Sequence, residues 1–335
     1  MKSPAATALW VALIMIQVST WSRADSQEAP PIAPPSEAQL RTSISQGLGF
    51  LARAGDQWME EKSCNSCHHM PLLLWSHREA KARGFAIDER RYDEWLTWSL
   101  QRATDKAPGL EEASLMILAL PDRPATGLAK MLAAEQKPDG SWTPAGQFAT
   151  MQKRGTPDAL ANAVRLNLLA LNTVPSAKSD ADIAHAKAAS LLTAKDQPTA
   201  MESLVFRTLL SRQQGKAADA ETLCLRISRL QRGDGGWSSF IGENMSDPLA
   251  TGQVLVALRP FAGDSRFREA VARAQQWLLQ TQQKDGSWSS DITHISKIDR
   301  SAPAKAKSMK DATAIYRYWG SAWATIGLLQ AVPSK

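Results

Sequence analysis

The chain has 335 residues, of which 44% are hydrophobic and 21% charged, a balance typical of a globular protein and not of a disordered one. The net charge of +6 is small and dispersed, so the composition does not favour a nucleic-acid-binding protein. Three cysteines exclude a disulfide-rich scaffold, whereas twelve tryptophans, against seven phenylalanines and three tyrosines, indicate a repeated structural use of tryptophan.

Residues 1–24 have the pattern of a signal peptide for export. Lys2 supplies the positive charge, residues 5–18 form an apolar stretch, and Ser22-Arg23-Ala24 fits a cleavage site. The apolar stretch is shorter than the roughly 20 residues of a spanning helix, so cleavage is favoured over the alternative of an uncleaved anchor. We therefore expect a periplasmic or extracellular protein without a membrane span after cleavage, with a proline-rich linker over residues 25–37.

Helical patterns follow along the rest of the chain, and strand patterns are nearly absent. Because most of these segments follow one another after short connections, they pair naturally into about six helical hairpins. The expected helices are 38–54, 72–84, 89–104, 110–120, 127–136, 159–172, 180–194, 200–213, 218–231, 249–259, 266–282 and 311–332.

An internal repeat organises these helices, because the pattern Q-x-x-D-G-x-W occurs at 136–142, 231–237 and 282–288. In each repeat an amphipathic helix ends at the Asp-Gly pair, since glycine accepts the left-handed backbone that ends a helix. A helix that is apolar on almost all sides follows. The pattern predicts an outer layer of helices around a buried inner layer. The wider gap between the first two repeats predicts a degenerate unit near 195–197.

The repeat resembles the QW motif of the prenyltransferase and squalene-cyclase superfamily, and the resemblance covers most of residues 40–333. It implies an all-α fold, an α/α toroid of about six helical hairpins, as one domain over 38–335. In that superfamily the motif ties the end of an outer helix to its neighbour. The resemblance therefore implies a structural role for Gln136, Trp142, Gln231, Trp237, Gln282 and Trp288.

The acid and zinc chemistry of that superfamily has no counterpart in this sequence. The D-x-D-D segment of hopene-type cyclases is absent, and Asp180 and Asp182 are better explained by the start of an exposed helix. Asp247 is expected to cap an inner helix. Cys224 lies within an amphipathic helix and has no aspartate two residues before it, so we expect a buried thiol and not a zinc ligand.

Cys64, Cys67 and His68 form the motif C-x-x-C-H, which is typical of covalent haem c attachment. Two thiols at this spacing can bond to the two vinyl groups of one porphyrin, and the next histidine can ligate the haem iron from the proximal side. The predicted export supports this interpretation, because haem c is attached outside the cytoplasm. The alternatives are a disulfide, a redox-active thiol pair and a zinc site, and haem c is favoured over them.

The haem-attachment segment is expected at 58–75, within the first hairpin, and no sixth iron ligand is assigned. The segment is similar to exported squalene-cyclase-like proteins that carry C-x-x-C-H. A basic insertion at 289–311 is expected as a solvated loop, or alternatively as a lid over the mouth of the toroid. The histidines and methionines weighed as sixth ligands are His69, Met70, His77, His185, His294 and Met309.

Three functional hypotheses follow. The first is an exported haem c-binding α/α-toroid protein for electron transfer or redox or ligand binding, which would need a redox partner protein. The second is a squalene-cyclase- or prenyltransferase-like enzyme that acts on an isoprenoid or other apolar substrate in the toroid cavity without the usual D-x-D-D acid. The third is a structural repeat protein in which Cys64 and Cys67 form a disulfide.

Overall fold

The computed structural model describes residues 33–62, 65, 69–105, 107–121, 125–144, 156–193, 197–290 and 302–334. The predicted signal peptide and most of the proline-rich linker lie outside these ranges. Within them the chain is helical, with one isolated bridge between Ala200 and Phe240. The all-α prediction is therefore confirmed.

The helices lie close to their predicted positions. They are α1 (Glu37–Glu61), α2 (Met70–Ala82), α3 (Glu89–Asp105), α4 (Leu110–Ala119), α5 (Thr126–Ala134), α7 (Thr156–Leu171), α8 (Lys178–Thr193), α9 (Met201–Gln213), α10 (Ala217–Arg229), α11 (Pro248–Leu258), α12 (Ser265–Thr281) and α13 (Ala302–Leu329), with short 3-10 turns at Pro175–Ala177 and Arg259–Phe261.

The largest difference from the prediction is at the start of α13, which begins at Ala302 and not near residue 311. Part of the expected insertion at 289–311 is thus helical. Residues 304–310 are alanine, lysine, serine and methionine, most of which favour a helix, and Pro303 lies in the first turn, where its missing N–H removes no helical hydrogen bond. Residues 291–301 lie outside the described part of the chain.

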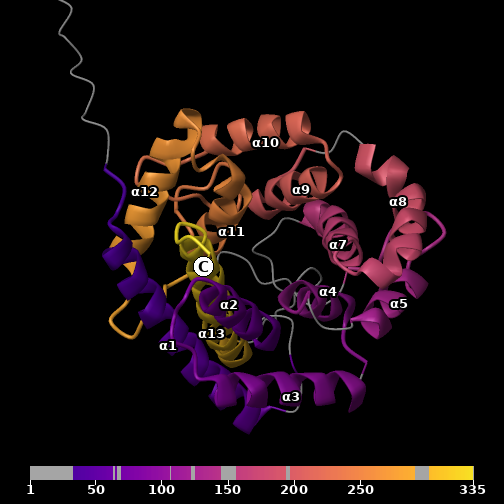
Figure 1. The fold of residues 1–335 in the computed structure, drawn as a ribbon, viewed down its shortest axis with the longest axis horizontal. Helices are drawn as coiled ribbons and strands as arrows, with labels where there is room; N and C mark the ends of the chain where they lie inside the picture. Colours follow the sequence, from indigo (N-terminus) through magenta and orange to yellow (C-terminus); the bar gives the residue numbers. More distant parts are fainter. Residues whose placement is uncertain are drawn as a thin grey trace, which may run out of the picture. The chain divides into compact units, whose positions relative to one another are not determined.

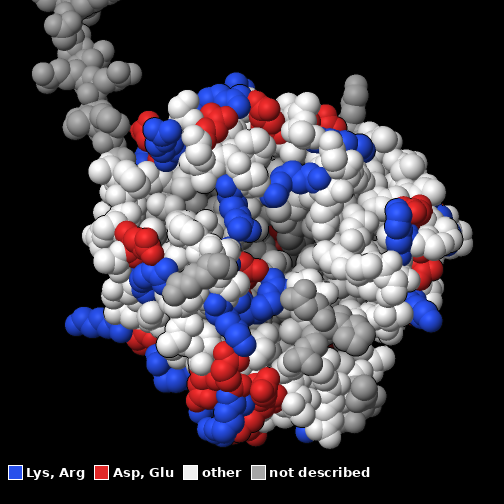
Figure 2. Space-filling view, viewed as in Figure 1, with Lys and Arg blue, Asp and Glu red and all other residues white. Residues whose placement is uncertain are grey.

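The helices form two concentric layers (Figure 1). The outer layer consists of α1, α3, α5, α8, α10 and α12, and the inner layer consists of α2, α4, α7, α9, α11 and α13. Outer helices such as α10 bury one stripe of residues, whereas α11 is buried along almost its whole length. Outer and inner helices alternate in sequence, so the fold is the predicted α/α toroid. The inner helices surround a hollow that Figure 2 shows at the centre of the ring.

Among the described residues, no helix combines the length and the apolar character needed to cross a membrane.

The Q-x-x-D-G-x-W repeats join neighbouring outer helices. In the third repeat, Gln282 Nε2 donates hydrogen bonds to the carbonyls of Gly286 and Ser43, both at 3.0 Å. The Trp288 indole donates to the Leu278 carbonyl at 2.7 Å and is buried. The predicted structural role of the motif is therefore confirmed. The first two repeats make the same bonds, from Gln136 to Gly140 and Ala184, from Gln231 to Gly235 and Ala270, from Trp142 to Leu132, and from Trp237 to Ile227.

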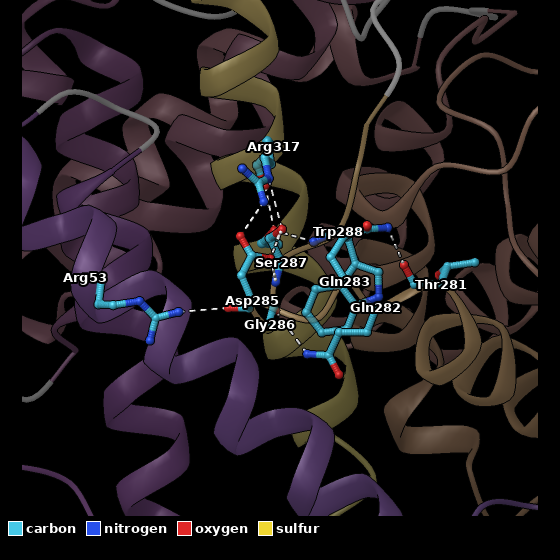
Figure 3. Close-up of polar contacts among 10 residues, drawn as sticks. Arg53, Thr281, Gln282, Gln283, Asp285, Gly286, Ser287, Trp288 and Arg317 are labelled. Carbon is cyan, nitrogen blue, oxygen red and sulfur yellow. Dashed lines mark hydrogen bonds and ion pairs between the residues drawn. The ribbon is translucent and has the colours of Figure 1, made fainter.

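The third repeat also closes the ring (Figure 3). Ser43 lies on α1 and Gln282 ends α12, so their hydrogen bonds join the first outer helix to the last. In the same turn Asp285 pairs with Arg317 of α13, and Arg53 of α1 donates to the Asp285 carbonyl at 2.8 Å. One turn therefore connects three helices from opposite ends of the sequence.

Candidate functional site

A cavity of about 380 Å³ lies at the centre of the toroid, and all six inner helices line it. Its volume falls within the roughly 300–1,000 Å³ of small-molecule sites. We call this cavity the central chamber. Its lining is almost entirely apolar and consists of Trp75, Leu115, Leu118, Leu166, Leu169, Phe206, Leu209, Val256 and Trp323, together with the polar Arg212 and Gln213.

The chamber follows from the apolar character of the inner helices. Phe206, Leu209 and Gln213 lie three and four residues apart on α9, so they share one face of that helix. The opposite face packs against the outer layer. One wall consists of the indoles of Trp75 and Trp323, whose ring centroids are 5.4 Å apart in an edge-to-face arrangement. The side chains that turn inward leave space at the centre and make its surface apolar.

A buried polar layer lies next to the chamber, nearer the N-terminal ends of the inner helices. Glu202 of α9, one turn before Phe206, is 3% exposed. Its carboxylate accepts hydrogen bonds from Asn162 Nδ2 of α7 at 3.1 Å and from Gln253 Nε2 of α11 at 3.0 Å. Because a buried carboxyl group is costly unless it is hydrogen-bonded, these two amides help to accommodate it at this depth.

Asp158 is a second buried carboxylate, but its oxygens are occupied. It accepts hydrogen bonds from the backbone N–H groups of Thr199 and Ala200, both at 2.8 Å, and from the Thr199 hydroxyl at 2.6 Å. The Ser203 hydroxyl lies 2.7 Å from Asp158 and 2.6 Å from the Asn162 amide oxygen, so it links Asp158 to the polar layer. Asp158 therefore anchors the segment that leads into α9.

The other aspartates noted in the sequence are structural, as predicted. Asp247 caps α11, because its side chain accepts from Leu249 N at 2.8 Å, and Ser290 donates to its other oxygen at 2.8 Å. Asp180 lies in the first turn of α8, and Asp182 pairs with a lysine one turn earlier on the exposed face of that helix.

Cys64, Cys67 and His68 lie outside the described residues, so haem c and the role of these side chains stay predictions. On the flank of the motif, the buried His69 ring is stacked between the rings of Trp58 and Tyr318, with both centroid distances 4.0 Å. A cleft of about 440 Å³ lies beside these rings. Since the residues that would attach a porphyrin are not described, we derive no chemical step through haem.

Two other histidines and the third cysteine lie within the described part of the chain, and each has structural surroundings. His77 is buried with Nδ1 2.9 Å from the Leu73 carbonyl, and burial lowers its pKa to about 4, so it is a neutral core residue. Burial also lowers the pKa of His185, which lies on the outer helix α8. Cys224 is a buried free thiol, and burial raises its pKa to about 12. Across the described ranges, no group of three or more His, Cys, Asp or Glu side chains could hold a metal ion.

Comparison with known proteins found similarity in solved structures only. No model of a protein family matches the chain, and no curated protein matches it. One crystal structure, described as a possible member of the GH105 family from Salmonella enterica serovar Paratyphi A, is 12% identical, covers 91% of this chain and 98% of that chain, and has a TM-score of 0.54. Another possible GH105 member, from Klebsiella pneumoniae, is 10% identical with coverages of 91% and 97% and a TM-score of 0.53. At these identities the likeness establishes the fold alone.

These findings correct the family predicted from the repeat. The assignment to the prenyltransferase and squalene-cyclase superfamily is wrong, because the similar structures are possible GH105 members and no family model matches. The physical reason is that the Q-x-x-D-G-x-W turn joins neighbouring outer helices through backbone carbonyls. A joint of this kind can serve a ring of helical hairpins whatever its family, so the toroid that the resemblance implied is correct although the family is not.

The function predicted from the sequence is corrected together with the family. Neither a haem c-binding electron-transfer protein nor a cyclase- or prenyltransferase-like enzyme is supported, because the structural neighbours are described as possible members of a glycosidase family. The motif C-x-x-C-H has only five residues, and the prediction of a haem c-binding function depended mainly on it.

Proposed function

We propose that the protein binds an apolar small molecule in the central chamber. The observation that carries the proposal is that six helices turn apolar side chains into one cavity without filling it. The volume is sufficient for a small molecule. Most of the lining offers water no hydrogen-bond partner, so burial of an apolar molecule against it is favourable.

A variant that fills the chamber tests this proposal. Val256 is a half-buried residue of the chamber wall, and Val256→Trp would place a large ring in the cavity. Val256→Ala keeps the cavity open and serves as the matched control. We expect Nile red, a neutral apolar dye, to bind the full chain and Val256→Ala but not Val256→Trp, as measured by fluorescence titration. Thermal unfolding would check that both variants are folded, and unchanged dye binding by folded Val256→Trp would contradict the proposal.

Glycoside hydrolysis is a second candidate, favoured by the likeness to two possible GH105 members and by the carboxylate of Glu202 beside the chamber. Glycosidases generally use two carboxyl groups on either side of the scissile bond. Asp158 is the carboxylate linked to Glu202, but its oxygens are already hydrogen-bonded, and the adjoining chamber is apolar. Release of chromophore from aryl glycosides by the full chain, abolished in Glu202→Gln, would favour hydrolysis. No turnover would leave ligand binding as the function.

A further inference from the structure

Two arginines lie near each other at the mouth of the chamber. Arg212 lines the chamber at the last turn of α9, and Arg259 follows the end of α11. Neither guanidinium group makes a hydrogen bond or an ion pair with any described residue. Arg78, at the same end of α2, differs because it donates to the carbonyls of Leu118 and Ala119 at 3.0 and 2.6 Å.

The neighbours of Arg212 do not neutralise its charge. Burial and the positive charge of Arg259 lower the pKa of the Arg212 guanidinium, and the other group that acts on it is the thiol of Cys224. That thiol is neutral at pH 7, because its own pKa is raised to about 12. Arginine itself remains protonated under ordinary conditions. Two positive charges therefore lie near each other, and neither pairs with a carboxylate of the described residues. Figure 2 shows Lys and Arg side chains around the central hollow, with some acidic side chains among them.

The C-terminal ends of the inner helices, with their backbone carbonyls, also face the mouth. Other side chains already donate hydrogen bonds to some of these carbonyls. Gln213 donates to the Leu169 carbonyl at the end of α7, as Arg78 does at the end of α4. Arg212 and Arg259 are thus cations near this rim whose guanidinium groups are not paired with described residues, so they are available to a ligand. Guanidinium groups bind the oxygens of carboxylate and phosphate in a bidentate geometry.

We propose that the ligand is an amphiphile, with an apolar chain in the central chamber and an oxyanion head group bound by Arg212 and Arg259. This inference rests on the proposed function and adds the chemical class of the ligand. The chamber lining recognises the chain through burial of apolar surface, and the two guanidinium groups recognise the head group. Both a carboxylate and a phosphate provide the required oxygens.

Calorimetric titration of the full chain with three ligands of equal chain length tests the inference. Decanoate and decyl phosphate carry the two anionic heads, and 1-decanol carries none; all are used below the concentrations at which they aggregate. We expect at least one anion to bind about tenfold more tightly than decanol, because hydrogen bonds to charged groups are strong. Added salt should weaken anion binding and leave decanol binding unchanged.

Single substitutions separate the head group from the chain. Arg212→Gln and Arg259→Gln should each weaken binding of the anion about tenfold without changing decanol binding. Arg229→Gln, which removes an exposed arginine from the outer helix α10, is the matched control and should change neither. Preference for decanoate or for decyl phosphate would identify the head group, and either supports the inference.

The contrary outcomes are distinct. If decanol binds the wild type and Arg212→Gln as tightly as both anions do, the head-group inference is overturned and the proposed function stands. If none of the three ligands binds, and Nile red does not bind, the proposed function itself fails. If the anions bind Val256→Trp as well as they bind the wild type, their site is not the chamber and the inference is overturned.

Discussion

His77 shows how a polar side chain is held in the core of this ring. It is 4% exposed, it contacts the Leu73 carbonyl through Nδ1, and its ring meets the indole of Trp95 edge-on with centroids 4.8 Å apart. Asp56, which accepts a hydrogen bond from Trp95 at 2.7 Å, favours the protonated form of His77, but burial outweighs it. The imidazole is therefore neutral in the folded chain at pH 7.

This neutrality predicts a loss of stability in acid. As pH falls, the unfolded chain binds a proton at His77 near pH 6.5, whereas the folded chain binds it only near pH 4. The unfolded state therefore gains protons first, and the free energy of unfolding should fall by up to about 3 kcal/mol between pH 7 and pH 4. Urea unfolding of the wild type and of His77→Gln across this range measures the effect.

The matched comparison is His185→Gln, because that residue is a half-buried histidine on the outer layer. His77→Gln should reduce the dependence of unfolding free energy on pH more than His185→Gln does. Equal pH dependence in the wild type and His77→Gln would show that His77 does not contribute in this way.

Polar residues inside the inner helices were the part of the site that the sequence did not predict. The sequence predicts only that Glu202 lies near the start of a helix over 200–213. In the structure Glu202 accepts hydrogen bonds from the amides of the buried polar layer. Its partners come from two other helices, at Asn162 and Gln253, and periodicity within one helix cannot predict contacts between helices. The single acidic residue of this inner helix was the available signal.

At the scale of elements, the repeat predicted local structure well because its causes are local. Gly286 has a φ of 90°, the backbone conformation that ends the turn of the third repeat, and a Cβ at this position would meet the Gln46 carbonyl of α1. The Asp-Gly pair thus identifies both the end of a helix and a close approach between helices. The start of α13 was predicted less well, although Ser301, a residue type that often caps helices, directly precedes Ala302 in the sequence.

Gly286→Ala should therefore destabilise the protein by about 2 kcal/mol or more, because alanine resists a positive φ and its methyl group would displace the backbone of α1. The measurement is denaturant unfolding. Gly127→Ala is the matched control, since Gly127 lies in α5 with no atom within 4 Å of an added Cβ. The control should leave stability unchanged or slightly raised. Equal effects of both substitutions would contradict the role assigned to Gly286.

At the scale of the whole molecule, the toroid is one closed ring whose ends meet. α13 packs against α2 and α11, and the third repeat joins α12 to α1. The two layers of helices could be predicted from the repeats, and the resemblance implied the closed ring, whereas the family it implied was wrong. The repeated turn joins the outer helices of the ring. The side chains that line the chamber, such as Phe206 and Arg212, are not part of the repeat, so the repeat does not predict the ligand.

The closed ring predicts that the helices unfold cooperatively. Gln282→Ala removes the hydrogen bonds to Ser43 and Gly286 at the joint between the first and last outer helices, and should cost about 1–3 kcal/mol. Because each helix packs on neighbours at both sides, this loss should lower the stability of the whole ring, with one unfolding transition. Gln283→Ala, which removes an exposed neighbour, is the control and should have little effect. Hydrogen exchange of the backbone amides in Gln282→Ala measures how far the effect extends. Faster exchange throughout α4, α7 and α9 would support a single cooperative unit. Faster exchange confined to α1 and α12 would show that the joint stabilises only these two helices.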